Sequence, residues 1–339
     1  MKPTIVFLDV FSLGGADLSR ITRLGKYIEY QTTKPEEVVE RCKDAEIVIT
    51  NKVRIGADDM AALPRLRLIC VAATGMNNID LPAAAERGIM VRNAVGYSTE
   101  TVAETTIGDA IALLRQVTYY DNFVKSGAYA ASPRWINFDR KLYSLSGKNW
   151  GIIGLGNIGR RVAHLAEAFD CNIAYTSTSG AKRPERYEQK PLNELLAWAD
   201  IISVHCPLSE QTRGLIGAEE LEQMKPTAIL INVARGGIID EQALADALNE
   251  GVIAGAGIDT YSIEPMKADN PLLSLKDPYK LIASPHNAWA ATEAIDKLVG
   301  CIADNINHWF IEEGLNGSVI ANSAEAAKQV GDSHTTLAR

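Results

Sequence analysis

The sequence predicts an α/β protein with two doubly wound parallel-sheet domains. Strand-like and helix-like segments alternate in both halves of the chain, a pattern typical of parallel sheets. A glycine-rich turn stands between a predicted strand and a predicted helix in the second half. The length of 339 residues suits two domains of ordinary size. These three observations agree on one fold class.

The first hundred residues contain five short apolar runs that predict strands. Helical candidates lie between them, and the clearest is Lys34–Cys42, which has Pro35 in its first turn and acidic residues after it. No glycine fingerprint follows any of these runs, so this half is not expected to bind a dinucleotide. The predicted strands are Thr4–Leu8, Tyr27–Tyr30, Glu46–Thr50, Leu66–Ala72 and Ile89–Arg92.

One long helical stretch is predicted over Tyr97–Lys125, because apolar side chains recur there at helical spacing. Residues 98–100 offer a cap for its N-terminus. The next segment, Ala128–Leu145, has no clear period and contains Trp135 and Phe138. It is either an arm that packs on a partner subunit or a surface loop whose aromatic side chains are buried.

The glycine-rich turn follows the apolar run Trp150–Ile153, which suits a buried strand. The turn has the pattern G-x-G-x-x-G, and helical spacing of apolar residues follows over Arg160–Phe169. In this context the three glycines permit a tight turn, a close approach to a pyrophosphate, and close packing of helix on strand. The helix N-terminus offers free N–H groups to phosphates. The cofactor-binding residues predicted here are Gly154, Gly156, Asn157, Ile158 and Gly159.

The alternation of strands and helices continues to the end of the second half. Further strands are predicted over Asn172–Thr176, Ile201–Val204, Ala228–Val233, Val252–Ile258 and Tyr279–Ser284. Helices are predicted over Leu192–Ala199, Ala218–Met224, Glu241–Glu250 and from about Thr292 to Ile311. Ala321–Arg339 is polar and aperiodic, so we expect a mobile tail there.

Charge and cysteine content exclude several classes of protein. A net charge of -8 argues against nucleic acid or an anionic membrane surface as a partner. The five scattered cysteines form no C-x-x-C pair, which indicates reduced thiols rather than disulfides or a metal site. Asp9 interrupts the first apolar run, so no signal peptide is predicted, and no run approaches the roughly 20 residues of a membrane span. A cytoplasmic location is expected.

Three chemically useful side chains follow predicted strands of the second domain. Ligands of a doubly wound sheet bind at the carboxyl ends of its strands, and Arg235, Glu264 and His286 come just past three of them. Hydride transfer to a ketone needs a proton donor, which histidine supplies near neutral pH. A guanidinium holds a carboxylate, and a carboxylate bonded to an imidazole favours its charged form. Arg235 is either a surface arginine or a ligand contact, and the adjacent Gly236-Gly237 favours the contact because flexible backbone suits close approach of a ligand. On spacing alone, Glu264 matches a solvated loop glutamate.

Position favours His286 over the other histidines as the catalytic residue. His164 and His308 lie on predicted helices and His334 lies in the tail, so we expect them to be structural or solvated. His205 also follows a strand, on the part of the sheet where an adenine would lie. A backbone contact with the cofactor is favoured there over catalysis.

Over nearly its whole length, except the tail, the sequence resembles the D-isomer-specific 2-hydroxyacid dehydrogenases. The motifs that carry the resemblance are A-A-T-G-M-N-N-I-D at Ala72–Asp80, I-L-I-N-V-A-R-G-G-I-I-D at Ile229–Asp240, G-I-D-T-Y-S-I-E-P at Gly257–Pro265 and S-P-H-N-A-W at Ser284–Trp289. The resemblance implies a Rossmann dinucleotide-binding domain at residues 100–289. It also implies a discontinuous flavodoxin-like substrate domain, formed by residues 1–99 and 290–320, and a homodimer.

The resemblance also implies roles for individual residues. Arg235 would bind the substrate carboxylate and carbonyl, His286 would be the acid/base catalyst, and Glu264 would pair with His286. The predicted substrate-binding residues are Thr74, Gly75, Met76, Arg235 and His286. Further implied cofactor contacts are Thr212, Val233, Ala234, Arg235, Asp259 near the nicotinamide carboxamide, and His286.

One position departs from the pattern of NAD-preferring members. They carry an acidic residue about 20 residues beyond the glycines, where it bonds the ribose 2′-hydroxyl. Here Thr176 stands at that place and Ser177 follows it. A neutral turn does not repel a 2′-phosphate, and Lys182 or Arg183 would either attract one or point into solvent. The expected cofactor is therefore NAD or NADP, with NADP left open.

The sequence T-N-K at Thr50–Lys52 and the tryptophan Trp289 resemble the glycerate dehydrogenase/hydroxypyruvate reductase branch of this family. By this resemblance, the reaction is reduction of a small 2-oxo acid, hydroxypyruvate or glyoxylate, to the D-2-hydroxy acid. A D-lactate-type or phosphoglycerate-type dehydrogenase is an alternative within the family. A dinucleotide-sensing corepressor of the same fold is an alternative of a different class.

Overall fold

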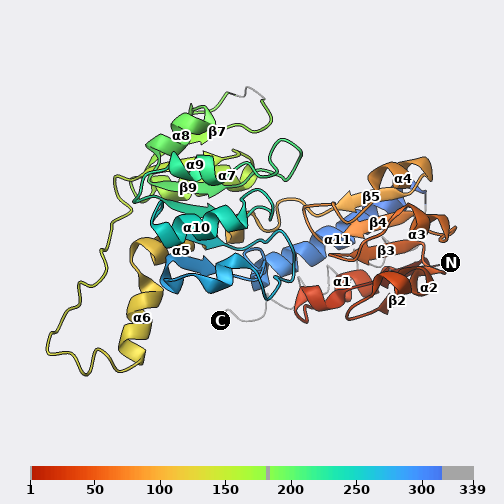
Figure 1. The fold of residues 1–339 in the computed structure, drawn as a ribbon. Coiled ribbons are helices and arrows are strands. Elements are labelled where there is room, and N and C mark those ends of the chain that lie inside the picture. The colour runs from red at the N-terminus through yellow and green to blue at the C-terminus, as the bar shows by residue number, and fades with distance from the viewer. Residues whose placement is uncertain (1, 181–183, 315–339) are drawn as a thin grey trace, which may run out of the picture. The chain divides into compact units, whose positions relative to one another are not determined.

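The computed structural model describes residues 2–180 and 184–314. It divides the chain into two compact units (Figure 1). The first unit comprises the chain up to Tyr97 and from Ala291 on, and the second unit comprises Ser98–Ala290. Lys182, Arg183 and the expected tail, Ala321–Arg339, lie outside the described residues.

Five parallel strands form the sheet of the first unit, in the order β2-β1-β3-β4-β5. The central strands β3 and β4 are buried over their whole length. Parallel strands that are covered on both faces form continuous apolar runs, which is why the sequence identified them. The chain winds outward in both directions from β1, so the sheet is doubly wound, as predicted. The strands are β1 Thr4–Phe7, β2 Lys26–Glu29, β3 Ile47–Thr50, β4 Leu68–Val71 and β5 Met90–Asn93.

Short helices connect these strands, and one long helix, α11 (Thr292–Glu312), packs on β4 and β5. α11 buries Leu298, Ile302 and Ile306, which recur at helical spacing. Glu312 at its end forms a 2.5 Å ion pair with Arg92 of β5. The remaining elements are η1 Val10–Leu13, α1 Ser19–Thr22, η2 Pro35–Glu37, α2 Val38–Cys42, α3 Ala57–Ala61 and α4 Leu81–Glu86.

Seven parallel strands form the sheet of the second unit, in the order β12-β11-β10-β9-β6-β7-β8. β6 lies between β9 and β7, so the strand order reverses beside β6, as in dinucleotide-binding sheets. The short strand β8 was not predicted. The strands are β6 Asn149–Ile153, β7 Asn172–Thr176, β8 Glu188–Gln189, β9 Ile201–Val204, β10 Ile229–Asn232, β11 Gly255–Ile258 and β12 Leu281–Ala283.

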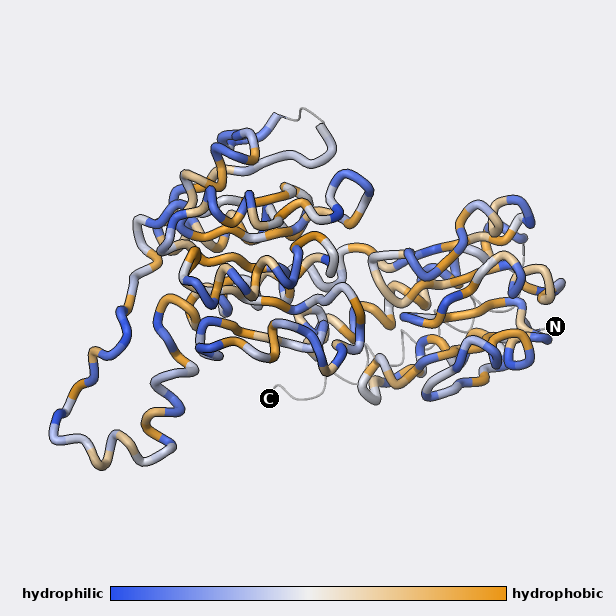
Figure 2. The backbone as a smooth tube through the Cα atoms, in the orientation of Figure 1, coloured by the Kyte–Doolittle hydropathy of each residue, from blue (hydrophilic) through white to orange (hydrophobic). Residues whose placement is uncertain are grey.

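Helices cover both faces of this second sheet. α5 and α7 share one apolar cluster with β6, whereas α8, α9 and α10 pack into a second cluster. Figure 2 shows hydrophobic residues concentrated in the strands of each unit. The helices are α5 Thr99–Leu114, α6 Val117–Lys125, α7 Asn157–Glu167, α8 Leu192–Trp198, α9 Ala218–Glu222 and α10 Glu241–Glu250, with the 3-10 turns η3 Pro271–Ser274 and η4 Pro278–Lys280.

The prediction of one helix over Tyr97–Lys125 is wrong, because the helix breaks between α5 and α6. Gln116 has a φ of +52°, the left-handed conformation that ends a helix. Its side-chain Nε2 donates to the carbonyl of Leu113 at 2.7 Å. The helical spacing of apolar residues continues across this break, so the spacing does not predict it.

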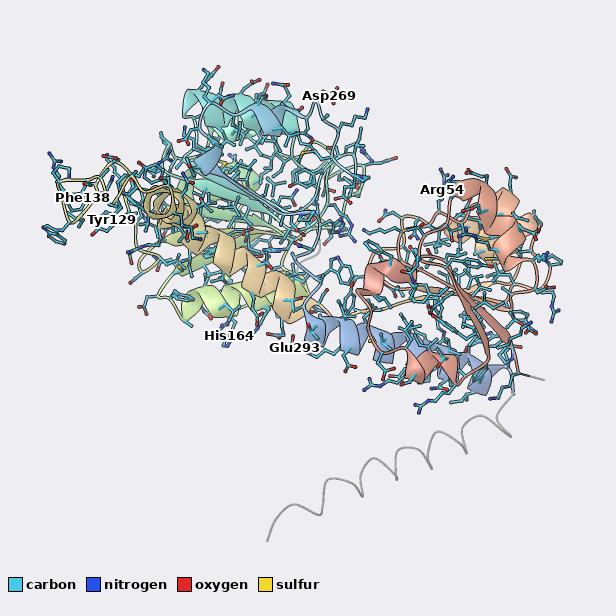
Figure 3. The ribbon with its side chains drawn as sticks, turned by 90° about the horizontal axis from the view of Figure 1, so that it is seen from below. Arg54, Tyr129, Phe138, His164, Asp269 and Glu293 are labelled. Carbon is cyan, nitrogen blue, oxygen red and sulfur yellow. The ribbon has the colours of Figure 1, made fainter. Side chains whose placement is uncertain are left out.

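The segment between α6 and β6 forms an arm, defined here as residues 126–144, that leaves the body of the second unit (Figure 1). Trp135 and Phe138, the two aromatic side chains singled out in the sequence, are 82% and 78% exposed, so the alternative that they are buried is wrong. Figure 3 labels Tyr129 and Phe138 on this arm. Arg140 anchors it by bonds to the side chains of Gln116 (3.0 Å) and Asp277 (2.8 Å).

The described residues lack two features of other protein classes. None of their helices is long and apolar enough to cross a membrane. They contain no group of three or more His, Cys, Asp or Glu side chains that could hold a metal ion. The five cysteines form no disulfides.

Candidate active site

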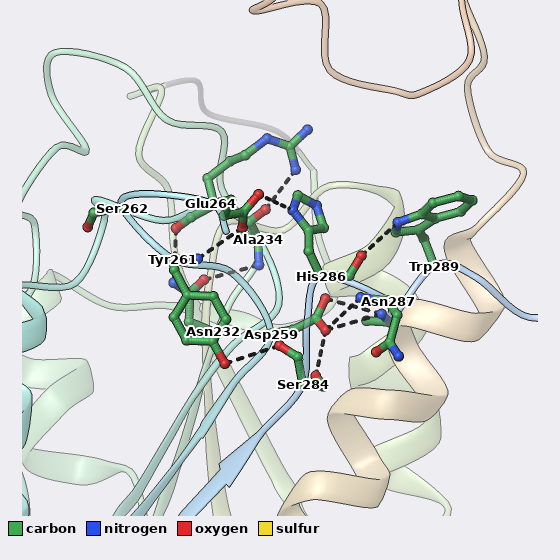
Figure 4. A network of polar contacts seen from close by, with 12 residues as sticks. Asn232, Ala234, Asp259, Tyr261, Ser262, Glu264, Ser284, His286, Asn287 and Trp289 are labelled. Carbon is green, nitrogen blue, oxygen red and sulfur yellow. Dashed lines mark hydrogen bonds and ion pairs between the residues drawn. The ribbon is translucent and has the colours of Figure 1, made fainter. Parts of the chain in front are cut away.

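Arg235, Glu264 and His286 follow three neighbouring strands of the second sheet. They come after β10, β11 and β12 respectively, and parallel strands end at the same edge of a sheet. The Oε2 atom of Glu264 lies 2.7 Å from Nδ1 of His286 (Figure 4). The edge therefore carries a guanidinium, a carboxylate and an imidazole, the last two in direct contact.

The turn that presents Arg235 is shaped by the buried side chain of Asn232. Its Oδ1 accepts the N–H of Ala234 at 3.0 Å, and its Nδ2 donates to the carbonyl of Arg235 at 2.9 Å. Gly236 sits so close to the next loop that a Cβ there would lie 1.9 Å from the carbonyl oxygen of Tyr261. The guanidinium of Arg235 donates to the carbonyl of Ala234, which among residues 2–180 and 184–314 leaves four of its five N–H donors for a ligand.

Glu264 is held at both carboxylate oxygens. Oε1 accepts the N–H of Tyr261 at 3.0 Å, while Oε2 contacts His286. The hydroxyl of Tyr261 lies 3.1 Å from the carbonyl oxygens of Ile258 and Ser284, so it joins the ends of β11 and β12. Burial, with a smaller effect of the Asp259 charge, raises the pKa of Tyr261 to about 12, so this hydroxyl keeps its proton.

The loop that carries His286 is organised by Asp259, which is 1% exposed. The carboxylate of Asp259 accepts the N–H groups of Asn287 and Ala288 at 2.9 and 3.1 Å and the hydroxyl of Ser284. Its backbone carbonyl accepts the N–H of His286 at 2.7 Å. The resemblance placed Asp259 against the cofactor, whereas the structure shows its side chain engaged by this loop.

The glycine turn joins β6 to α7, which begins at Asn157 rather than at Arg160 as predicted. Gly154 has a φ of +95°, and a Cβ there would lie 2.7 Å from the backbone nitrogen of Cys206. A Cβ at Gly159 would lie 2.4 Å from the carbonyl oxygen of Gly154, so helix and strand touch. A Cβ at Gly156 would meet nothing within 4 Å. The turn thus fits a dinucleotide, with open space at the helix N-terminus.

His205 follows β9 and lies beside this turn. Its backbone N–H donates to the carbonyl of Ile153 at 2.8 Å, and the expected backbone contact with a cofactor stays a prediction. Both ring nitrogens are buried without a hydrogen-bond partner among the described residues. Burial lowers the pKa of His205 to about 3, which keeps the ring neutral. Unpartnered buried nitrogens point to a ligand, and this observation supports the fit of an adenosine.

The end of β7 lacks the carboxylate of an NAD-preferring turn. Thr176 is 7% exposed, and its carbonyl accepts the N–H of Gly154 at 3.0 Å. The hydroxyls of Ser177 and Ser179 lie 3.4 Å apart. Residues 176–180 are all uncharged. The described part of this turn therefore neither repels nor attracts a 2′-phosphate.

The other predicted cofactor contacts are mostly buried. The hydroxyl of Thr212 donates to the carbonyl of Pro207 at 2.7 Å and so closes its own loop. Val233 is 6% exposed, and Ala234 is half-buried at the start of the Arg235 turn. Their contacts with a cofactor stay predictions.

Thr74–Met76 lie in the first unit, after β4, at the carboxyl edge of its sheet. The hydroxyl of Thr74 donates to the carbonyl of Ala94 at 3.0 Å. The carboxylate of Asp9 accepts the N–H groups of Asn51 and Lys52 at 2.8 and 2.6 Å, at the end of β3. Sequence reasoning used Asp9 only to exclude a signal peptide, although an acidic residue directly after a buried strand was a usable signal.

A family model described as the NAD binding domain of D-isomer specific 2-hydroxyacid dehydrogenases matches residues 107–288. The chain belongs to this family. The family expected from the sequence motifs is therefore confirmed.

Curated relatives and solved structures align with most of this dehydrogenase. It is 41% identical to the glycerate dehydrogenase of Methylorubrum extorquens, over 90% of this chain and 96% of the relative. It is 37% identical to the hydroxypyruvate reductase of Blautia hydrogenotrophica, over 93% and 98%. The NADPH-dependent glyoxylate/hydroxypyruvate reductase of Sinorhizobium meliloti, solved with NADP and malonate, is 28% identical, with a TM-score of 0.79 and coverage of 91% and 94%.

Sequence reasoning also missed a half-buried carboxyl, Asp109, on helix α5. Its side chain lies against β11, because a Cβ at Gly257 would be 3.0 Å from its Oδ2. Burial, together with the charge of Asp259, raises the pKa of Asp109 to about 7. An acidic residue within an apolar helical stripe was the available signal.

We expect Asp109 to make stability depend on pH. Its pKa is raised in the folded state, so its contribution is fully present below about pH 4 and is lost as pH rises through about 7. The free energy of unfolding of Asp109→Asn, relative to the unaltered protein, should therefore rise from pH 6 to pH 8.5 in urea titrations. Glu104→Gln, at an exposed position on the same helix, is the control. An equal difference at both pH values contradicts the assignment.

Proposed function

We propose that this dehydrogenase reduces a small, polar 2-oxo acid to the D-2-hydroxy acid, with hydroxypyruvate or glyoxylate as substrate. The observation that carries the proposal is the His286–Glu264 contact of 2.7 Å, at the sheet edge where Arg235 also lies. The names of the similar glycerate dehydrogenase and hydroxypyruvate reductase support the choice of substrate.

In this proposal, Arg235 holds the carboxylate of the substrate with two hydrogen bonds. Glu264 engages Nδ1 of His286, so the proton for transfer is held at Nε2. When bound, the reduced dinucleotide would supply the hydride for C2 of the substrate. His286 gives its proton to the carbonyl oxygen, and together the hydride and proton convert the carbonyl group to an alcohol, which is secondary for hydroxypyruvate and primary for glyoxylate.

We propose that the second unit binds the dinucleotide and that the first unit contributes the substrate loop Thr74–Met76. The open space at Gly156 and the unpartnered ring of His205 support the dinucleotide site. The uncharged turn at Thr176 supports use of NADP as well as NAD, as does the similar reductase solved with NADP. The five unpaired cysteines support a reducing compartment, the cytoplasm.

We further propose a homodimer in which a second copy of this chain covers the arm. Exposed apolar side chains of this kind mark interfaces when they gather on one segment. The exposed side chains on the arm are Tyr129, Trp135, Ile136, Phe138 and Leu142.

The reaction is tested by the oxidation of NADH and NADPH with hydroxypyruvate, glyoxylate, pyruvate and a longer 2-oxo acid. The first two acids should give the highest kcat/KM. His286→Ala should lower kcat by about 100- to 10,000-fold, because the proton donor is lost. His164→Ala, on the exposed face of α7 (Figure 3), should leave kcat unchanged. Binding of the dinucleotide without turnover of any acid contradicts the proposal and favours a dinucleotide sensor.

The dinucleotide site is tested by Gly156→Ala. The added Cβ meets no protein atom, so the free energy of unfolding should stay within about 1 kcal/mol of the unaltered value. The affinity for NADH and NADPH, measured by fluorescence titration, should fall about tenfold or more because the methyl group occupies the phosphate position. Unchanged affinity for both dinucleotides contradicts the placement of the pyrophosphate. Strong preference for NADH in the unaltered protein contradicts use of NADP.

The dimer is tested by sedimentation of a variant with Trp135→Ser and Phe138→Ser. The unaltered protein should sediment with the mass of two chains, and the variant should shift toward one chain because the buried apolar area is lost. Phe11→Ser, at a 72% exposed side chain outside the arm, is the control. A monomeric unaltered protein, or a variant that stays dimeric, contradicts this role of the arm.

A further inference from the structure

His286 has a backbone conformation that side-chain-bearing residues rarely adopt. Its φ is +55°, in the left-handed region. Such a conformation persists only where the surrounding contacts over-determine it, and it is found at functional sites. One of these contacts is the bond from the His286 N–H to the carbonyl of Asp259 at 2.7 Å. On the other side of the residue, Asp259 holds the N–H of the peptide, which Asn287 donates at 2.9 Å, and the carbonyl of His286 needs a second contact.

A tryptophan side chain supplies that second contact. The Nε1–H of Trp289 donates to the carbonyl oxygen of His286 at 2.9 Å (Figure 4). The N–H groups of Asn287 and Ala288 are directed to the carboxylate of Asp259. The turn from 286 to 289 is therefore closed by the indole of Trp289.

Trp289 is well placed to act as a fixed support. Its ring is half-buried and packs against the apolar cluster that α5 shares with β6. Its backbone carbonyl accepts the hydroxyl of Thr101, on α5, at 3.4 Å. An indole combines a large apolar body with a single N–H donor, so burial of the body directs the donor. The packing of Trp289 on α5 thus fixes where its N–H meets the carbonyl of His286.

We propose that Trp289 is a positioning residue whose indole N–H, acting through the carbonyl of His286, holds the imidazole in contact with Glu264. Rotation of this peptide would swing the Cα–Cβ bond of His286 and break the 2.7 Å contact. A displacement of about 1 Å at a catalytic group lowers a rate by up to about a hundredfold. The inference rests on the proposed function, because that function gives His286 the proton transfer.

The test removes the N–H donor and keeps an aromatic ring. In Trp289→Phe, and in a protein with benzothienylalanine at 289, which replaces only the N–H by sulfur, the carbonyl of His286 loses its donor. We expect kcat per site to fall about tenfold, as for one lost hydrogen bond at a buried group, with KM for the 2-oxo acid within about twofold. Sites are counted by fluorescence titration with the reduced dinucleotide, so loss of folded protein changes their number and not kcat per site.

Trp198→Phe is the matched control, because it makes the same substitution at a partly buried tryptophan of α8 in the same unit. Its kcat per site should equal that of the unaltered protein. A kcat per site within twofold of the unaltered value in both Trp289 variants overturns the inference. An unaltered protein that reduces none of the acids contradicts the proposed function instead.

A second measurement tests the geometry without turnover. The proton between Nδ1 of His286 and Glu264 should give a downfield proton NMR resonance, which Glu264→Ala removes and thereby assigns. We expect this resonance to shift or disappear in both Trp289 variants and to stay in Trp198→Phe, because only the former release the imidazole. A resonance that is unchanged in the Trp289 variants overturns the inference, whatever the activity of the protein.

Discussion

The geometry of the site depends on the hydrogen bonds that the buried carboxylate of Asp259 accepts. It accepts two backbone N–H groups and a hydroxyl from the loop after β12, while its own backbone carbonyl binds His286. Hydrogen bonds to an ionised group are stronger than neutral ones, and the removal of one partner leaves the others buried and unsatisfied. Asp259, which follows β11, therefore fixes the position of the imidazole of His286, which follows β12.

Side chains also bind backbone groups at other loops of both sheets. The residues that follow a parallel strand make no hydrogen bonds to a neighbouring strand. Their backbone groups therefore need other hydrogen-bond partners where they are buried. Asn232 supplies them to the Arg235 turn, Tyr261 to the ends of β11 and β12, and Asp9 to residues after β3. Side chains that bind backbone groups thus determine the shape of the loops at the carboxyl ends of the strands.

The positions of Arg235, Glu264 and His286 at the ends of strands were predictable from the sequence, but the contacts that hold these side chains were not. Buried parallel strands give apolar runs, so the ends of the strands, and with them Arg235, Glu264 and His286, could be read from the sequence. The left-handed conformations of Gln116 and His286 could not be predicted from the sequence, because they are imposed by tertiary contacts rather than by local preference. The position of Asp109 against β11 is likewise a product of helix packing, which apolar spacing does not report.

Within the second unit, the edge at β10–β12 carries charged side chains, whereas the turn after β7 is uncharged. The edge at β10–β12 carries Arg235 and the hydrogen-bonded pair of Glu264 and His286, which suits an anionic substrate and a proton transfer. The turn after β7 is uncharged over residues 176–180, the ring of His205 is neutral, and Arg160 on α7 is paired with Glu185. A 2′-phosphate there would meet no uncompensated carboxylate from these groups, so tolerance of NADP would follow from the lack of repulsion and would not require a dedicated cation.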